Sequence, residues 1–260
     1  MQDAPRQRIK ELLLLHRTRE RRAQGLALVP GFKCVGELLA SPWPLVEVLA
    51  TDEALDKLPN SLRKRLDRGV PLLRIHESDA VKLAAQPTPE GLVAVAAVPA
   101  GLEDTLALTG DGGPQLVLDG LADPGNLGSV IRTAAWFGIT RVVLVGDCAD
   151  LCSAKVLRAS MGAVFRLTRA CRVEDVGQSE WTGSGRWIGL EALGDHPLQG
   201  FRFLPGDVLV MGSESHGLGP TQTRLDTTLS IPGAAGVESL NVGHAFAITA
   251  WEQYRQALDD

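Results

Sequence analysis

The feature of this sequence that most constrains its fold is a series of short apolar runs in the second half of the chain, several of them wholly hydrophobic. They predict strands at Leu116–Leu118, Val142–Val145, Phe165–Leu167, Trp187–Leu190, Val208–Met211 and Thr228–Ile231. Strands without polar alternation suit a parallel sheet that is buried on both faces. The segments Leu127–Phe137 and Ala154–Met161 are expected to be helical, and an apolar stripe from Val242 to Tyr254 predicts a C-terminal helix. The pattern predicts an α/β domain.

The first hundred residues predict a smaller α/β domain. A basic amphipathic helix is expected over residues 5–24, with strands at Leu26–Val29, Leu45–Ala50, Val70–Ile75 and Leu92–Val98 and helices near Val35–Leu39 and Leu62–Leu66. The stretch from Pro99 to Pro114 is rich in Gly, Pro and Asp, which is typical of a domain boundary. We therefore expect an N-terminal domain at residues 1–100, a linker at 101–113 and a second domain at 114–260.

The charge is distributed unevenly along the chain. The formal net charge is −5, but residues 1–100 carry 15 Lys and Arg against 12 Asp and Glu, whereas residues 101–260 carry 11 against 19. Much of the positive charge lies near the N-terminus, and a second cluster runs from Arg63 to Arg68. This asymmetry favours a contact between the first domain and a polyanion, although a solvated helix face gives the same pattern.

Other composition features narrow the class of protein. No secretion signal is visible at the N-terminus, and the longest later apolar stretch, Leu92–Val98, is far shorter than a membrane span. We therefore expect a cytoplasmic protein without a membrane partner. The four cysteines, Cys34, Cys148, Cys152 and Cys171, are too scattered for a disulfide framework or a zinc site, so buried or idle thiols and no metal are expected.

Ligands in α/β sheets bind at the carboxyl ends of strands, so three loops that follow predicted strands are the candidate site. Loop one, residues 119–126, contains the turn Pro124-Gly125 and leads into a helix that Asn126 could cap. Arg132 follows in that helix, where a guanidinium and a helix N-terminus together suit a phosphate. A capped helix with a surface arginine is the plainer interpretation.

Loop two, residues 212–217, places Glu214 between Gly212 and Gly217, which lets the backbone approach a ligand closely. Ser215 suggests a hydrolase, but the first glycine of the nucleophile elbow is missing and no helix follows directly. Loop three, residues 231–241, runs from Ile231-Pro232 to Ser239-Leu240-Asn241 before the last helix. It is rich in glycine, yet it lacks the G-x-G-x-x-G pattern of a nicotinamide dehydrogenase.

In this order, the three loops resemble the motifs of the SpoU (TrmH-type) family of RNA ribose 2′-O-methyltransferases in the SPOUT superfamily. Loop one resembles D-P-x-N-x-G-x-x-x-R, loop two resembles G-x-E-x-x-G, and loop three resembles I-P followed by S-L-N-V. The stretch Lys155–Gly162 is also similar to the family. Residues from about Arg21 to Val98 resemble its smaller L30e-like substrate-binding domain. Pro30-Gly31 and Gly243-His244 depart from the usual pattern. The second pair could alter helix packing or place His244 near a subunit interface, although a core or surface histidine is the plainer interpretation.

The resemblance implies a trefoil-knotted parallel-sheet SPOUT domain with a smaller L30e-like domain, a homodimer, and S-adenosylmethionine as cofactor. Implied cofactor contacts are Met211, Gly212, Ile231, Pro232 and Leu240. The implied catalytic set is Asn126, Arg132, Glu214, Ser239 and Asn241. Candidate RNA contacts are Arg19, Arg21, Arg22, Lys33, Arg132 and Arg158.

The roles of the catalytic set follow from motif position. Because a guanidinium stays protonated at neutral pH, Arg132 is expected to hold an RNA phosphate beside the target, with that phosphate or a water taking the hydroxyl proton. Asn126 is expected to orient Arg132 or the ribose, Glu214 to fix the loop or the arginine, and Ser239 and Asn241 to position the nucleotide. The L30e-like domain favours large-subunit (23S) rRNA as substrate. A tRNA substrate and a catalytically inactive RNA-binding relative are the alternatives.

Overall fold

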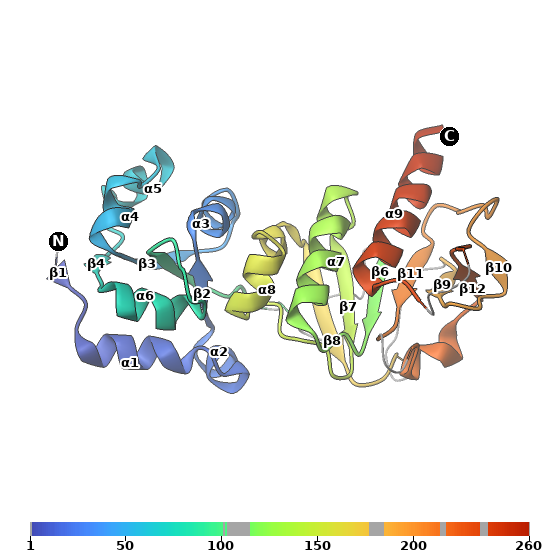
Figure 1. Ribbon diagram of the computed structural model, residues 1–260, viewed down its shortest axis with the longest axis horizontal. Coiled ribbons are helices and arrows are strands. Elements are labelled where there is room, and N and C mark those ends of the chain that lie inside the picture. Colours follow the sequence, from blue (N-terminus) through green and yellow to red (C-terminus); the bar gives the residue numbers. More distant parts are fainter. Residues whose placement is uncertain are drawn as a thin grey trace. The chain divides into compact units, whose positions relative to one another are not determined.

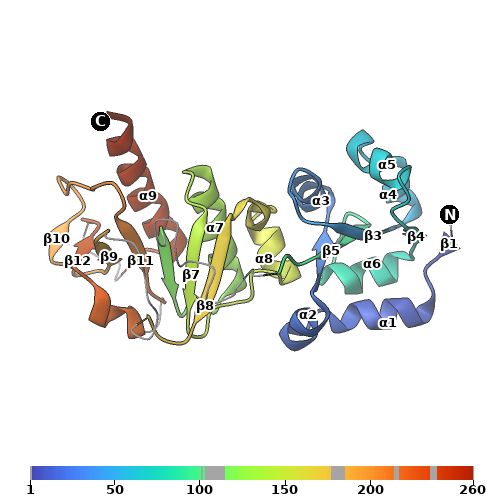
Figure 2. The same cartoon turned by 180° about the vertical axis from the view of Figure 1, so that it is seen from behind.

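A computed structural model describes residues 2–100, 102, 115–176, 185–213, 217–234 and 239–259 of the chain. The chain divides into two compact units: unit 1 is Met1–Ala100 with Asp150–Arg166, and unit 2 is Gly101–Ala149 with Leu167–Asp260. Figures 1 and 2 show the elements of each unit from opposite sides. Residues 150–166 come from the middle of the predicted second domain, yet they pack within unit 1. No helix among the described residues is both long and apolar enough to cross a membrane.

Unit 1 is built on a five-stranded sheet in the order β1-β4-β3-β5-β2. Its strands are β1 (Gln2–Asp3), β2 (Leu26–Pro30), β3 (Leu45–Ala50), β4 (Leu72–Arg74) and β5 (Leu92–Ala97). β5 is antiparallel to both β2 and β3, whereas β1, β4 and β3 are parallel. Its helices are α1 (Arg6–Leu14), α2 (Thr18–Gln24), α3 (Phe32–Leu39), α4 (Asp52–Asp56), α5 (Asn60–Leu66), α6 (Glu77–Ala84), α8 (Ala154–Ala159) and the 3-10 helix η2 (Ala163–Arg166).

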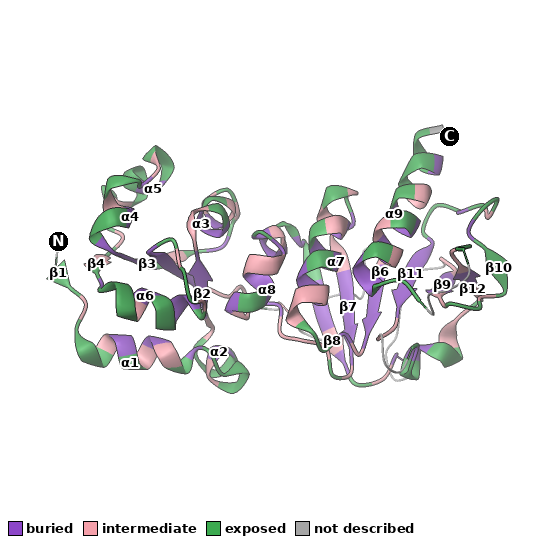
Figure 3. Ribbon diagram, viewed as in Figure 1, coloured by how far each residue is buried: buried purple, intermediate pink, exposed green. Residues whose placement is uncertain are grey.

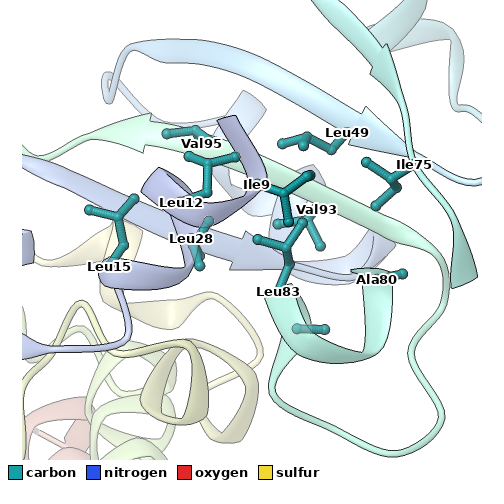
Figure 4. Packing of buried hydrophobic residues seen from close by; sticks show 11 residues of the cluster. Ile9, Leu12, Leu15, Leu28, Leu49, Ile75, Ala80, Leu83, Val93 and Val95 are labelled. Carbon is teal, nitrogen blue, oxygen red and sulfur yellow. The ribbon is translucent and has the colours of Figure 1, made fainter. Parts of the chain in front are cut away.

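The core of unit 1 follows from strand alternation, because successive side chains of β5 point to opposite faces of the sheet. Val93 and Val95 point to the face that α1 and α6 cover, where apolar side chains of both helices pack on them (Figure 4). The predicted helix over residues 5–24 is two helices instead of one. The chain bends after Leu15, which is 1% exposed, and the Arg21 guanidinium binds the Leu15 carbonyl oxygen at 2.7 Å. The bend lets both residues turn inward.

Unit 2 contains a seven-stranded sheet in the order β10-β12-β9-β11-β6-β7-β8, and every described pairing in it is parallel. Its strands are β6 (Leu116–Asp119), β7 (Arg141–Val145), β8 (Arg169–Val173), β9 (Trp187–Leu190), β10 (His196–Pro197), β11 (Val208–Met211) and β12 (Thr227–Ser230). The helices α7 (Pro124–Trp136) and α9 (Val242–Asp259) lie side by side over one face (Figures 1 and 3). A 3-10 helix, η4 (Pro220–Arg224), precedes β12. The strands β6 and β11 are buried throughout, and so is β7 after its half-buried first residue, Arg141, as their apolar runs predict.

Three predictions of local structure were wrong or incomplete. Phe165 belongs to η2 instead of a strand, and its ring packs edge-to-face on Trp43 with centroids 5.0 Å apart. The strand in this region is β8, whose two arginines mask its apolar pattern. Tyr254, placed at the end of the buried stripe of α9, is 40% exposed. The helices α4 and α6 were not predicted, because neither carries a long apolar periodicity.

Candidate functional site

The topology of unit 2 brings all three motif loops to one edge of the sheet. Loop one follows β6, loop two follows β11 and loop three follows β12, and these strands lie in the run β12-β9-β11-β6. Because every pair in the run is parallel, the carboxyl ends of its strands lie at the same edge, with neighbours about 4.8 Å apart. The loop of residues 191–195, after β9, leaves from the same edge. The edge is therefore the candidate functional site.

Loop one is shaped by the cap of α7. Asp123 is the N-cap, and its carboxylate oxygen Oδ1 accepts a hydrogen bond from the Asn126 backbone at 2.8 Å. Pro124 occupies the first helical position, where a backbone N–H would find no helical partner. Asn126 was expected to be the cap, but it lies in the first turn. Its side chain is thereby left available for a longer-range contact.

That contact joins loop one to loop three. Asn241 Nδ2 donates a hydrogen bond to Asn126 Oδ1 at 3.0 Å, and Asn241 Oδ1 accepts one from the Gly243 backbone at 3.0 Å. One side chain therefore caps α9 and links the starts of α7 and α9. A Cβ atom at Gly243 would lie 3.1 Å from Ser129 Oγ, so the departure from the family pattern at this position permits a close approach of the two helices. The positive ends of two helix dipoles meet here, which favours an anionic ligand.

Loop two is closed by a pair of backbone hydrogen bonds. The Ser213 N–H donates to the Gly217 carbonyl at 3.0 Å, and the Gly217 N–H donates to the Ser213 carbonyl at 2.9 Å. A Cβ atom at Gly212 would collide with the backbone of Gly217, so only glycine fits there. Glu214, the predicted acidic member of the catalytic set, lies outside the described residues. The two ends of loop two are therefore held together, with the Gly212 backbone against that of Gly217.

The predicted cofactor contacts differ in exposure. Met211 is 2% exposed, so its side chain belongs to the core, whereas Leu240 is 48% exposed. Ile231 is half-buried and Pro232 is exposed, as is Ser239. Residues 235–238 of loop three lie outside the described residues. The described part of loop three therefore offers apolar surface at the edge of the sheet.

The sequence analysis missed a further exposed apolar residue on a loop at this edge. Leu193, in the loop after β9, is 94% exposed. Its loop is tied to β12, because the Asp195 backbone donates to Thr228 Oγ1 at 2.9 Å and Thr228 Oγ1 donates to the Asp195 carboxylate at 2.9 Å. The sequence signal that could have identified Leu193 is an apolar residue just after a predicted strand. Its loop carries no glycine-rich motif.

Arg132 lies on α7 six residues after Asn126. Helix geometry turns its side chain about 120° around the axis from Asn126 and about 9 Å further along. Arg132 is exposed, on the same side of α7 as Ser129 and Trp136. Within the described part of unit 2 no carboxylate pairs with it. The structure therefore brings Asn126 and Asn241 together but leaves the Arg132 guanidinium facing solvent.

Loop one rests on groups that the sequence analysis treated as idle. Cys148 Sγ accepts a hydrogen bond from the Leu121 backbone at 3.3 Å and donates to the Leu118 carbonyl at 3.2 Å. Burial raises the pKa of the Cys148 thiol, so the protonated form that donates is retained. Arg172 in turn donates to the Cys148 and Ala149 carbonyls at 3.0 and 2.9 Å. The thiol therefore binds the start of loop one directly, and the guanidinium holds the segment that carries the thiol.

The candidate RNA contacts in unit 1 fall into two groups. Arg21, one of the predicted RNA contacts, is 4% exposed and pairs with Asp150 at 2.9 Å within the unit. Arg158 donates to the carbonyls of Ala84 and Ala85 at the end of α6, and burial lowers its pKa. Arg19, Arg22 and Lys33 are exposed. These three side chains are accessible from solvent.

Lys33 belongs to a small ionic network. It pairs with Glu37 at 2.8 Å, and Arg166 pairs with the same carboxylate at 2.7 Å. The hydrogen bond from Lys33, and then that from Arg166, lower the pKa of Glu37 against the opposing effect of burial. Among the described residues no group of three or more His, Cys, Asp and Glu side chains gathers as a metal site.

Comparisons with known proteins place this arrangement in context. The model of the SpoU rRNA Methylase family matches residues 114–251, and that of the MRM3-like substrate binding domain matches residues 6–94. The chain is 29% identical over 253 residues to the 23S rRNA (guanosine(2553)-2'-O)-methyltransferase RlmP of Bacillus subtilis, covering 96% of this chain and 97% of that protein. It is 30% identical over 251 residues to an uncharacterized tRNA/rRNA methyltransferase of Synechocystis, covering 95% and 90% of the two chains.

Solved structures agree with the sequence comparisons. The SpoU methyltransferase AviRb from Streptomyces viridochromogenes, in complex with AdoMet, superposes with a TM-score of 0.81 at 27% identity. The superposition covers 98% of this chain and 99% of that chain. The fold class predicted from the sequence, a SPOUT-type parallel-sheet domain with a smaller N-terminal α/β domain, is confirmed.

Proposed function

Since the chain belongs to the SpoU rRNA methylase family, we propose that it transfers a methyl group from S-adenosylmethionine to a ribose 2′-hydroxyl of large-subunit rRNA. The observation that carries the proposal is the Asn241–Asn126 hydrogen bond, which joins two motif loops 115 residues apart at one edge of the sheet. The relative in Bacillus subtilis is named for this reaction on 23S rRNA, and AviRb holds AdoMet in its solved structure. A cytoplasmic location fits such a substrate.

The edge of the sheet fits the cofactor. Leu193 and Leu240 are exposed apolar side chains on loops that leave this edge, as Ile231 and Pro232 also do, and such side chains suit the adenosine part. Gly212 leaves no room for a side chain, which keeps a bare backbone available for hydrogen bonds to a ligand. Bound there, S-adenosylmethionine supplies an electrophilic methyl group on a sulfonium, and the ribose 2′ oxygen displaces the thioether. The chain's residues hold the ribose in line with that methyl group, which lowers the barrier by preorganisation.

Arg132 supplies the phosphate contact. Its exposed guanidinium can form a bidentate pair with the RNA phosphate beside the target ribose. Because the guanidinium stays protonated, the hydroxyl proton leaves to that phosphate or to a water molecule. Asn126 orients the ribose, Ser239 and Asn241 position the nucleotide, and Glu214 binds the loop or the arginine by a charge-assisted hydrogen bond.

The two domains have different proposed functions, methyl transfer and RNA binding. The methyltransferase domain is proposed at residues 114–260, of which residues 150–166 pack within unit 1, and the RNA-binding domain at residues 1–100. The proposed linker is residues 101–113, which lie outside the described residues apart from residue 102. The match of residues 6–94 to a substrate binding domain supports this division, as do the exposed Arg19, Arg22 and Lys33. The exposed cations bind RNA backbone phosphates, which makes the affinity depend on salt.

The active form is a homodimer, formed through α7 and α9. Exposed apolar side chains gather on these helices: Trp136 is 83% exposed, Trp251 49% and Leu258 64%. On α9 the exposed positions recur at helical spacing, and Figure 3 shows its outer side as exposed. A self-complementary apolar patch of this kind suits a two-fold interface. Trp251→Glu should give monomers in light scattering, whereas Leu14→Glu, an exposed leucine on α1, should leave the dimer intact.

The decisive test of the reaction is a methyl-transfer assay with methyl-labelled S-adenosylmethionine. Large-subunit rRNA and tRNA, each from cells without the gene, serve as separate substrates. We expect label in the rRNA, at a 2′-O-methyl site that nuclease-resistance mapping finds only in RNA from cells with the gene. Label in tRNA alone would show that tRNA, and not rRNA, is the substrate. No transfer to either RNA by a protein that still binds RNA would identify an inactive relative.

A further inference from the structure

A buried carboxylate at the end of β6 has no role in the three motifs. Asp119 is 3% exposed, and its atom Oδ2 accepts three hydrogen bonds. The donors are the Gly219 backbone at 2.9 Å, the Thr221 backbone at 3.0 Å and Thr221 Oγ1 at 2.6 Å. Burying a carboxylate is unfavourable unless hydrogen bonds replace its hydration, so these three bonds are a strong and directional link.

These hydrogen bonds to Asp119 hold the segment that follows loop two in the chain. Gly219 lies two residues after Gly217, which closes loop two through its bonds to Ser213. Thr221, fully buried, is the second residue of η4, and its backbone and side chain both bind Asp119. The chain leaving loop two is therefore fixed to the end of β6.

The same carboxylate lies at the start of loop one. Leu118 pairs with Met211 across β6 and β11, so Asp119 and Gly212 leave the sheet side by side. Gly120 follows with φ of +67°, and a Cβ atom there would lie 3.6 Å from the Cβ of Ser213. Asp119 thus stands where loop one begins, and it binds the segment in which loop two ends.

We propose that Asp119 is a positioning residue that sets the geometry of loop two, and thereby the affinity for the cofactor. The proposal rests on the proposed function for the identity of the ligand. Asp119 does not touch the reacting atoms. Its carboxylate holds the turn Gly219–Thr221, so that the bare backbone at Gly212 and Gly217 stays in place to receive the cofactor.

The test uses side-chain changes that conserve volume. Asp119→Asn removes the charge, Thr221→Val removes one donor, and Thr221→Ser restores a hydroxyl. We expect Asp119→Asn to raise the Kd and the KM for S-adenosylmethionine about tenfold, and Thr221→Val to raise them about threefold, with the KM for RNA unchanged. Thr221→Ser should recover most of the loss. Thr223→Val is the matched control, because Thr223 lies in the same 3-10 helix, is exposed and donates only to the Pro220 carbonyl.

Two measurements separate positioning from general stability and from the proposed function. Calorimetric titration below the melting temperature gives the Kd, and a variant that melts earlier but keeps the wild-type Kd and KM would overturn the proposal. Hydrogen exchange of the backbone amides of Gly219 and Thr221 should be faster in Asp119→Asn, whether or not the enzyme acts on RNA. Unchanged exchange at both amides would also overturn it. A wild-type protein that fails to bind S-adenosylmethionine would overturn the proposed function, while faster exchange in the variant would still support the link.

Discussion

The two sheets of this protein place their strand ends differently. In the sheet of unit 2 every described pair is parallel, so the carboxyl ends of β12, β9, β11 and β6 lie along one edge. In unit 1 β5 runs against β2 and β3, so strand starts and strand ends alternate along the edge that they share. Chain segments more than a hundred residues apart therefore meet at the edge of unit 2, as Asn126 meets Asn241 and Asp119 meets Thr221.

Both units contain arginines that bind groups of their own unit and arginines that are exposed. In unit 1, Arg21 and Arg158 bind carbonyl oxygens of their own unit, and Arg8 binds the buried Glu47. In unit 2, Arg172 likewise binds carbonyl oxygens of its own unit, whereas Arg132, in the second half of α7, is exposed. A count of positive charge therefore points to the unit that is proposed to bind RNA, but burial decides which of its arginines are accessible to a ligand. Topology locates a site more sharply than charge does.

The largest effect is expected at Arg132. Arg132→Ala should lower single-turnover methylation about a thousandfold, because it removes a preorganised charge from the reacting ribose-phosphate. The Kd for S-adenosylmethionine should stay unchanged, since the proposed cofactor contacts lie on other loops. Arg132→Lys keeps the charge but loses the bidentate geometry. Its single-turnover rate should lie between those of wild type and Arg132→Ala. Wild-type turnover in Arg132→Ala would remove this residue from the site.

A loss of stability is expected at Arg21. Arg21→Met keeps the volume but leaves the Asp150 carboxylate, 10% exposed, without its cation, which should cost about 3 kcal/mol in the free energy of unfolding. Denaturant titration measures this change. Arg19→Met, at an exposed position two residues away, should leave stability unchanged and lower the salt slope of RNA binding by about 0.7. Weaker RNA binding by Arg21→Met at wild-type stability would return Arg21 to the RNA interface.

A smaller effect is expected at the link between the motif loops. Asn241→Asp keeps an oxygen to cap α9 but loses the donor to Asn126 and sets a carboxylate against the Asn126 carbonyl oxygen. Turnover should fall about tenfold, while the melting temperature stays close to wild type. Asn241→Ala, which loses the cap as well, should lose about 1 kcal/mol of stability in addition. Equal turnover in wild type and Asn241→Asp would show that the link serves folding alone.

The sequence predicted most of the sheet of unit 2, because wholly apolar runs report strands that are buried on both faces. It failed at β8, where Arg169 and Arg172 break the apolar pattern, and at Phe165, whose burial comes from Trp43 far away in the sequence. It also assumed one helix over residues 5–24. The bend after Leu15 depends on the inward turn of Arg21, and no local pattern announces a buried arginine.

Within the candidate site, some contacts could be predicted from the strand order and others could not. Asn126 and Asn241 meet because parallel strands bring their loops to one edge, which follows from the strand order. That Asp123 rather than Asn126 caps α7 depends on backbone angles that the dipeptide Pro124-Gly125 does not fix. Asp119 escaped notice because its partners lie about a hundred residues further along the chain. Its burial is a property of the folded edge alone.

The smallest effect is expected from pH, at the carboxylate that joins η2 to α3 within unit 1. Lys33 and Arg166 lower the pKa of Glu37 below its ordinary value of 4.5, so this group adds stability above pH 4.5 and loses it as the pH falls through the lowered pKa. Glu37→Gln should lose about 1 kcal/mol at pH 7 after allowance for screening of the two exposed cations, and the gap to wild type should close below pH 4.5. Glu53→Gln removes a fully exposed pair with Lys57 and serves as the control with the smaller change. A gap that stays constant down to the acid transition would show that packing against Glu37, and not its charge, holds η2 to α3.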